Sequence, residues 1–148
     1  MSQAQHVQML SQAFESQQWD VVESHLTDDF TFVGGAPMPL NKAQFLGTMK
    51  GTLAGVPDFS FNATEFKEHS ESHVEMVSQI TGTHTATLQN VIPGVPPLAA
   101  TGKAVALPQE RIHFTLQGQQ VSQIRVEQVE GGGIPGLFSQ LGVKLPNA

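Results

Sequence analysis

Apolar residues recur at two different spacings along this chain, and the spacing changes near Pro57. Before that point Val7, Leu10 and Phe14 repeat every three or four residues, which predicts a helix over roughly residues 4–17. Two more segments share this spacing and predict two further helices: Trp19, Val22 and Leu26, then Phe45, Met49 and Leu53 after the N-cap residue Asn41. A short strand is expected between them, at residues 30–33.

After Pro57 the pattern alternates between apolar and polar residues, which is typical of strands with one buried face. It predicts a strand at residues 59–63, two long strands at 74–88 and 103–117, and a last strand at 121–129. The Gly- and Pro-rich segments 91–102 and 131–136 are expected to be loops within one domain. The second of them leads to a short apolar turn at residues 137–141.

Helices followed by a run of antiparallel strands indicate an α+β fold. We expect residues 1–148 to form a single domain, with three N-terminal helices packed on a strongly curved, mostly antiparallel sheet. A bent sheet with helices across its mouth encloses one cavity.

Composition narrows the possible partners and location. The chain has 7 basic and 13 acidic residues, and the basic residues are scattered singly, so nucleic acid is not expected as a partner. No run approaches the roughly 18 apolar residues of a membrane span, and residues 1–6 lack the features of a signal peptide. The chain has no cysteine. We therefore expect a cytoplasmic protein without disulfides.

Motifs for metals, cofactors and nucleophilic catalysis do not occur. The histidines follow neither HxH nor HExxH spacing, so no metal site is expected. Gly131-Gly132-Gly133 follows a strand, but the chain has neither GxGxxG nor GxxxxGK[ST], so no nucleotide cofactor is expected. A GxSxG elbow is also missing, which argues against a serine hydrolase.

Several short segments together resemble a known family, because they occur in the same order over most of the chain. They are Leu26-Thr27-Asp28-Asp29-Phe30, Val56-Pro57-Asp58, Gly82-Thr83-His84-Thr85, Pro96-Pro97 with Thr101-Gly102-Lys103, Gly118 with Val121, and Gly136-Leu137-Phe138-Ser139-Gln140-Leu141-Gly142. This set resembles the SnoaL-like polyketide cyclases of the nuclear transport factor 2-like superfamily. The resemblance implies a cone-shaped fold of the kind that the hydrophobic pattern predicts.

The resemblance also identifies a difference that bears on activity. The cyclases carry an acid/base carboxylate in an HWD stretch of the last strand, and the matching positions here are Ile124, Arg125 and Val126. Glu127 is the nearest carboxylate, but successive strand residues point to opposite faces, so it is not expected to replace the missing acid. A shared fold does not imply shared chemistry.

The alternation predicts which residues line the cavity. We expect the wall to contain ten residues on the more apolar face of each element: Trp19, Phe32, Phe61, Ile80, His84, Glu110, Ile112, Phe114, Ile124 and Val126. His84 and Glu110 are the candidate catalytic residues, since buried ionisable groups can act as acid, base or hydrogen-bond partner. The alternatives are a structural histidine and a carboxylate at a solvated entrance. Arg111, His113, Arg125 and Glu127 are expected on the opposite face.

Three functions remain open at this point. The first is a protein that binds a small hydrophobic molecule in a mostly apolar pocket. The second is an acid/base enzyme, cyclase- or isomerase-like, acting on an apolar carbonyl compound, if His84 and Glu110 converge on one site. The third is a protein-interaction module, which a large apolar outer patch would favour. A homodimer through the outer sheet face is expected, because the long strands expose threonine-rich faces.

Overall fold

The computed structural model describes residues 2–92, 94–143 and 145. Along the chain the elements are α1 (Gln3–Glu15), α2 (Trp19–Ser24), β1 (Leu26–Val33), β2 (Leu40–Asn41), α3 (Lys42–Gly55), β3 (Thr64–Ser70), β4 (His73–Ser78), β5 (Thr81–Thr83), β6 (Ala104–Ala106), β7 (Glu110–Gln117), β8 (Gln120–Val126) and α4 (Gly133–Gln140). The three predicted N-terminal helices are therefore confirmed, and a fourth helix follows the sheet.

Local sequence fixes where the two long helices begin. The Ser2 hydroxyl accepts from the Gln5 backbone N–H while the Gln5 side chain accepts from the Ser2 backbone N–H, which forms a capping box at α1. Asn41 and Gln44 form the same arrangement at α3. The apolar stripes of both helices face the core.

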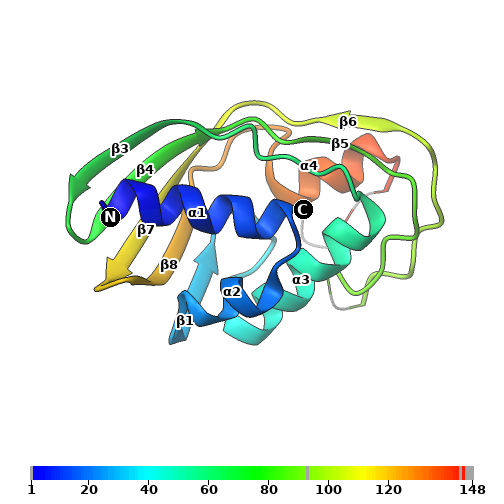
Figure 1. Ribbon diagram of the computed structural model, residues 1–148. Helices are drawn as coiled ribbons and strands as arrows, with labels where there is room; N and C mark the ends of the chain where they lie inside the picture. The colour runs from blue at the N-terminus through cyan, green and yellow to red at the C-terminus, as the bar shows by residue number, and fades with distance from the viewer. Residues whose placement is uncertain (1, 93, 144, 146–148) are drawn as a thin grey trace.

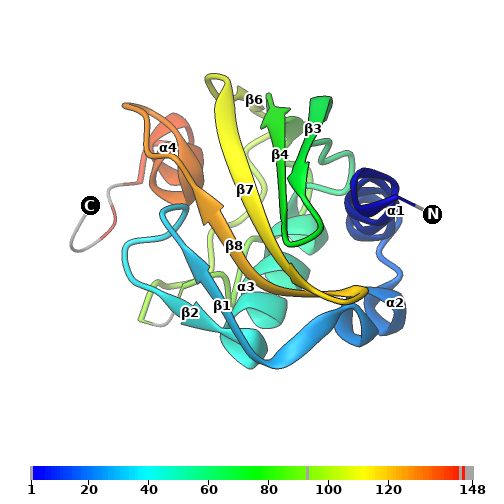
Figure 2. The same cartoon turned by 90° about the vertical axis from the view of Figure 1, so that its left-hand side faces the viewer.

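Six strands form the main sheet, in the spatial order β2-β1-β8-β7-β4-β3. Only the β1–β8 pair is parallel, and the other four pairs are antiparallel. Figure 2 shows this sheet from its outer side, with α3 and α4 behind the strands and α1 and α2 to their right. Helices α1, α2 and α3 cover the opposite, inner face, and β5 and β6 pass over the top (Figure 1). The predicted α+β architecture is confirmed.

Each of the two long predicted strands is broken at the same level. Residues 74–88 divide into β4 and β5, and residues 103–117 divide into β6 and β7. The two segments still pair beyond the break, but as a separate two-stranded sheet. Pro108 lies in the break and has no backbone N–H to donate to a neighbouring strand. The main sheet therefore ends at the Ser78–Glu110 pair.

Three other boundaries differ from the prediction. β1 starts at Leu26, before Asp28 and Asp29, which lie within the strand. The strand expected at residues 59–63 instead occupies residues 64–70. Positive φ angles occur at Asn62, in the expected segment, and at Glu65, within β3. Residues 133–140 form helix α4 rather than a linker and turn.

The alternation on β7 and β8 separates the two faces of the sheet as predicted. Ile112, Phe114 and Ile124 are buried, whereas Arg111 and Arg125 are exposed. Val121 and Ile124 are both buried although strict alternation would place them on opposite faces. A register shift in the β7–β8 pairing, between Thr115 and Leu116, accounts for this. Apolar side chains of β4, β7 and β8 thus face the helices and form one core with them.

Candidate functional site

A cavity of ≈ 80 Å³ lies inside the cone, between the inner face of the sheet and helices α1, α3 and α4. Its walls are almost entirely apolar, and four phenylalanines from α1, α3 and the segment before β3 form much of the lining: Phe14, Phe45, Phe59 and Phe61. The rings of Phe14, Phe45 and Phe61 pack edge-on, with Phe14 5.7 Å and 5.9 Å from its two neighbours. The cavity is therefore a hydrophobic space with a rigid aromatic side.

Three polar side chains line the cavity among the described residues: Ser11, Thr52 and Glu110. The Ser11 hydroxyl donates to the Val7 carbonyl at 3.1 Å, and the Thr52 hydroxyl donates to the Thr48 carbonyl at 2.8 Å. Both hydroxyl protons are used within their own helices. The two hydroxyl groups can therefore only accept from another molecule, and Glu110 is the side chain of this lining that can donate when protonated or accept with a charge when ionised.

Glu110 is the first residue of β7 and is 3% exposed. Burial raises the pKa of its carboxyl group, and the backbone N–H of Gly133, which donates to the carboxylate, partly offsets the rise. A Cβ atom on Gly132 would lie 2.9 Å from Glu110 Oε2, so the glycine makes room for the carboxyl group. Glu110 also borders an open groove lined by residues from segments 34–37, 128–132 and 135–143 and by Leu145, so it lies between cavity and surface.

Eight of the ten predicted wall residues line the cavity: Phe32, Phe61, Ile80, Glu110, Ile112, Phe114, Ile124 and Val126. Trp19 and His84 do not. Trp19 packs behind the wall, with its ring 6.1 Å from that of Phe14. The prediction for His84 was wrong because it extended the alternation of β4 beyond Ile80 and through β5, which belongs to a separate sheet.

His84 is fully buried just beyond β5. Its Nδ1 atom lies 2.9 Å from the Thr101 hydroxyl and accepts the Thr101 backbone N–H at 3.3 Å. The Nε2 atom has no hydrogen-bond partner among the described residues. Since His84 does not line the cavity, the two candidate catalytic residues do not converge on it.

Sequence reasoning missed the contribution of α4. Gly133, Ile134 and Leu137 close one side of the cavity, and the Ile134 backbone N–H donates to the Gly35 carbonyl at 2.8 Å. The spacing of Ile134, Leu137, Phe138 and Leu141 is helical and could have revealed the helix. The neighbouring glycines masked that signal.

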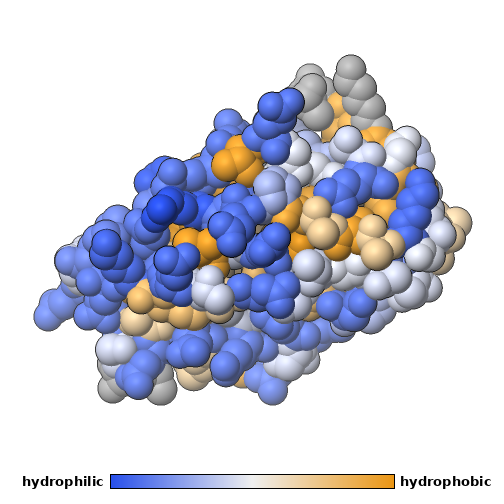
Figure 3. Space-filling view, turned by 90° about the horizontal axis from the view of Figure 1, so that it is seen from above, coloured by the Kyte–Doolittle hydropathy of each residue, from blue (hydrophilic) through white to orange (hydrophobic). Residues whose placement is uncertain are grey.

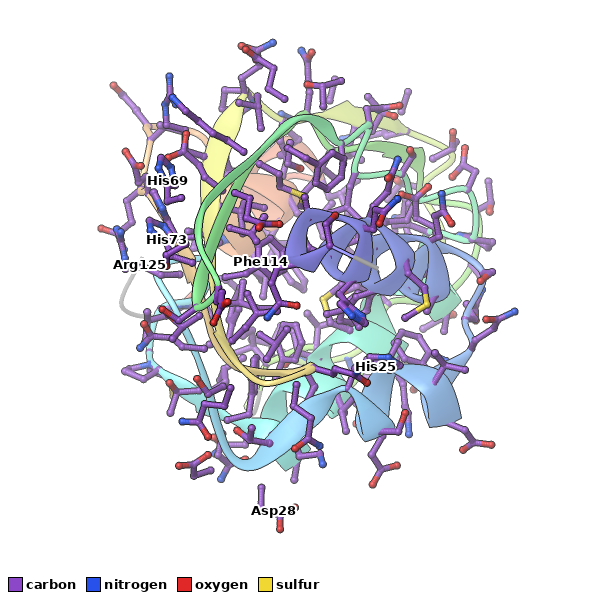
Figure 4. The ribbon with its side chains drawn as sticks, turned by 60° about the vertical axis from the view of Figure 1, so that its left-hand side comes forward. His25, Asp28, His69, His73, Phe114 and Arg125 are labelled. Carbon is purple, nitrogen blue, oxygen red and sulfur yellow. The ribbon has the colours of Figure 1, made fainter. Side chains whose placement is uncertain are left out.

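The outer face of the sheet is charged rather than threonine-rich. Glu75 on β4 and Arg111 on β7 form a 2.6 Å ion pair, and Arg125 lies nearby on β8. Figure 4 shows His69, His73 and Arg125 on this side of the sheet and Phe114 on the other. The threonines at 81 and 83 belong to β5, outside the main sheet. The basis of the expected dimer interface therefore differs from the one that the sequence suggested.

Other surfaces of the described residues give little indication of a partner. No cluster of three or more His, Asp or Glu residues within them could hold a metal ion. None of their helices combines the length and apolar character needed to cross a membrane. Seen from above, the surface is mostly hydrophilic with smaller hydrophobic areas (Figure 3). Met38 and Val129, each 40% exposed, are the large apolar side chains exposed in the described part of the chain.

Comparison with known proteins identifies the family and the fold. The family described as "NTF2-like domain" matches residues 4–92. IdmH from Streptomyces antibioticus is 18% identical, with a TM-score of 0.71, covering 97% of this chain and 100% of its own. A SnoaL-like polyketide cyclase from Agrobacterium tumefaciens is 13% identical, with a TM-score of 0.68 and coverages of 96% and 99%.

A third structure of the same fold contains a small ligand. It is a protein from Catenulispora acidiphila with a ketosteroid isomerase-like fold, in complex with trimethylamine. It is 16% identical, with a TM-score of 0.63, and the match covers 96% of this chain and 94% of that one. No curated protein matches the sequence. At these identities the similar structures establish the fold, and the resemblance to SnoaL-like proteins is confirmed at that level.

Proposed function

Because the chain belongs to the NTF2-like domain family, we propose that its cavity binds a small hydrophobic molecule that carries one polar group. The observation that supports this proposal is the position of Glu110, a buried carboxyl group at one end of an otherwise apolar cavity. An apolar wall with few polar groups suits a ligand whose body is desolvated and whose orientation is fixed by one hydrogen bond. The polar group of the ligand would meet Glu110.

The size of the cavity limits the ligand. A volume of ≈ 80 Å³ is below the roughly 300 Å³ of the smallest common ligand pockets. The ligand is therefore very small, or the wall moves to admit it. Met49 and Met76 line the cavity, and methionine side chains adapt their shape easily. The trimethylamine complex of the Catenulispora protein is an example of this fold with a ligand of very small size.

The proposal is tested with phenol and toluene, which share a ring and differ in one hydroxyl group. We expect both to bind the wild-type protein in calorimetric or NMR titrations, and phenol to bind more tightly. Glu110→Gln should weaken phenol binding by ~1–3 kcal/mol, or roughly 5- to 150-fold in Kd, and leave toluene binding unchanged. Glu130→Gln is the control, since Glu130 lies in the outer groove and not in the cavity.

Two results would contradict this proposal. One is that neither probe binds the wild-type protein or shifts resonances of cavity residues. The other is that Glu110→Gln and Glu130→Gln behave alike toward phenol. Native mass spectrometry of the purified protein would then show whether a different molecule is bound to the protein.

An acid/base enzyme is the second candidate function, favoured by the raised pKa of Glu110. Catalysis at a carbonyl compound also needs a donor for the developing oxyanion. His84 lies elsewhere, and Ser11 and Thr52 donate within their helices. Binding is therefore the better-supported function.

We also propose a homodimer that uses the outer face of the main sheet. Acidic Glu75 and Glu127 and basic Arg111 and Arg125 lie on one face, so two copies related by a two-fold axis could pair opposite charges. Light scattering at micromolar concentration should give twice the chain mass of 15.9 kDa. A monomer mass that persists at low salt would refute this assembly.

A further inference from the structure

Three histidines from three strands lie together on the outer face of the sheet. His69 on β3 stacks on His73 of β4, with ring centroids 4.6 Å apart (Figure 4). His73 Nε2 lies 2.9 Å from His113 Nδ1 on β7. We refer to His73 and His113 as the histidine pair. Neither ring is fully exposed, because both lie between neighbouring strands and side chains.

The hydrogen bonds of the pair determine where its protons lie. His113 Nε2 contacts the Glu127 carboxylate, and a carboxylate only accepts, so this nitrogen carries a proton. In neutral His113 the other nitrogen, Nδ1, is then an acceptor. The 2.9 Å contact therefore requires His73 to donate its Nε2–H to His113 Nδ1.

This arrangement accepts one added proton but not two. A first proton on either ring leaves one N–H···N hydrogen bond intact, because protonated His73 donates to His113 Nδ1 and protonated His113 donates to His73 Nε2. After the second proton both facing nitrogens carry hydrogen, which places two N–H donors and two positive rings face to face. We propose that the histidine pair is a two-step proton switch, in which the second protonation separates His73 from His113 and loosens the link between β4 and β7.

Both acidic and basic side chains surround the histidine pair, and they have opposite effects on its protonation. Glu75 accepts from His69 at 3.1 Å and from Arg111 at 2.6 Å, and it lies 3.9 Å from His113 Nδ1. Glu127 bonds His113, whereas Arg125 disfavours a positive charge on His73. Lys67, the register partner of Glu75, lies on the same face. The two carboxylates thus stabilise the first proton, and the cations oppose the second.

Burial, followed by the nearby His69 and His113, lowers the pKa of His73 from its ordinary 6.5. The unfolded chain therefore takes up a proton at His73 at a higher pH than the folded chain does. The stability linked to this group is complete above pH 6.5 and falls as the pH drops from there to the lowered pKa. The charge of the outer face changes over the same range.

Imidazole resonances of the full-length protein test the switch in an NMR titration. We expect the histidine pair to take up two protons in two separate steps, with the contact between the rings retained through the first and lost in the second. His113→Gln removes one of the two sites and should raise the midpoint of His73 by on the order of 0.5 to 1 pH unit. His25→Gln, a substitution well away from His73 in Figure 4, should leave that midpoint unchanged.

The switch is refuted if both rings take up protons in one step with their contact intact. A midpoint of His73 that does not move in His113→Gln refutes it equally. If His113→Gln does not fold, the wild-type titration still decides the first point.

Discussion

The inner and outer faces of β4, β7 and β8 use alternate residues of the same strands, but they are built differently. Ile112 and Phe114 point inward and line the mostly apolar cavity, while His113 between them points outward into a network of charges. The inner face is stabilised by burial, which is not directional. The outer face is organised by hydrogen bonds between ionisable groups, so its state depends on pH.

Two carboxylates on neighbouring strands express this difference most clearly. Burial raises the pKa of Glu110 on the inner face. Hydrogen bonds from His69 and Arg111 lower the pKa of Glu75 on the outer face. Their surroundings thus favour the neutral form of a carboxyl group on one side of the sheet and the ionised form on the other, and the strand pairing places the two only a few residues apart.

The largest effect is expected from truncating the inner face. Phe114→Ala removes a 3% exposed ring from the core and should reduce the free energy of unfolding by ~3–5 kcal/mol. Thr115→Ala, one residue further along and exposed, should change it by less than about 0.5 kcal/mol. Urea denaturation of both variants measures the contrast, and similar losses would mean that the two faces are not distinct in energy.

The sequence was sufficient to predict the inner face wherever a strand is continuous. Period-two alternation identified Ile112, Phe114, Ile124 and Val126 as wall residues, because parity holds as long as the chain stays in one sheet. It failed for His84, since alternation does not reveal a break such as the one at residues 79–80. Helix α4 was missed because glycines at its start resemble a linker, although Gly132 and Gly133 make room for neighbouring groups. The outer network depends on contacts between strands far apart in sequence, which a pattern along one strand does not contain.

A smaller effect is expected where α4 seals the inner face. In Gly132→Ala the added methyl group would lie 2.9 Å from Glu110 Oε2 and 2.8 Å from Val129 Cγ2, so the carboxyl group must move. We expect a loss of about 1–3 kcal/mol in the free energy of unfolding. Gly47→Ala is the matched control, because nothing lies within 4 Å of its new Cβ atom and alanine favours helix α3 by up to ~1 kcal/mol. If both variants gain stability, the fit between Gly132 and Glu110 is looser than the structure indicates.

The smallest effect, and the most direct test of the comparison, is the opposite response of the two carboxylates to pH. A folded-state pKa above the ordinary 4.5, as at Glu110, means that stability is complete below that value and is lost as the pH rises through the folded pKa. Glu75 has a lowered pKa, so its contribution is present above 4.5 and is lost as the pH falls through the folded value. As the pH rises from 4 to 7, the stability of Glu110→Gln relative to wild type should therefore increase, and that of Glu75→Gln should decrease. Thermal unfolding of wild type and both variants at pH 4 and pH 7 measures the two changes. Changes of the same sign would show that the two carboxylates do not differ in the direction of their pKa shifts.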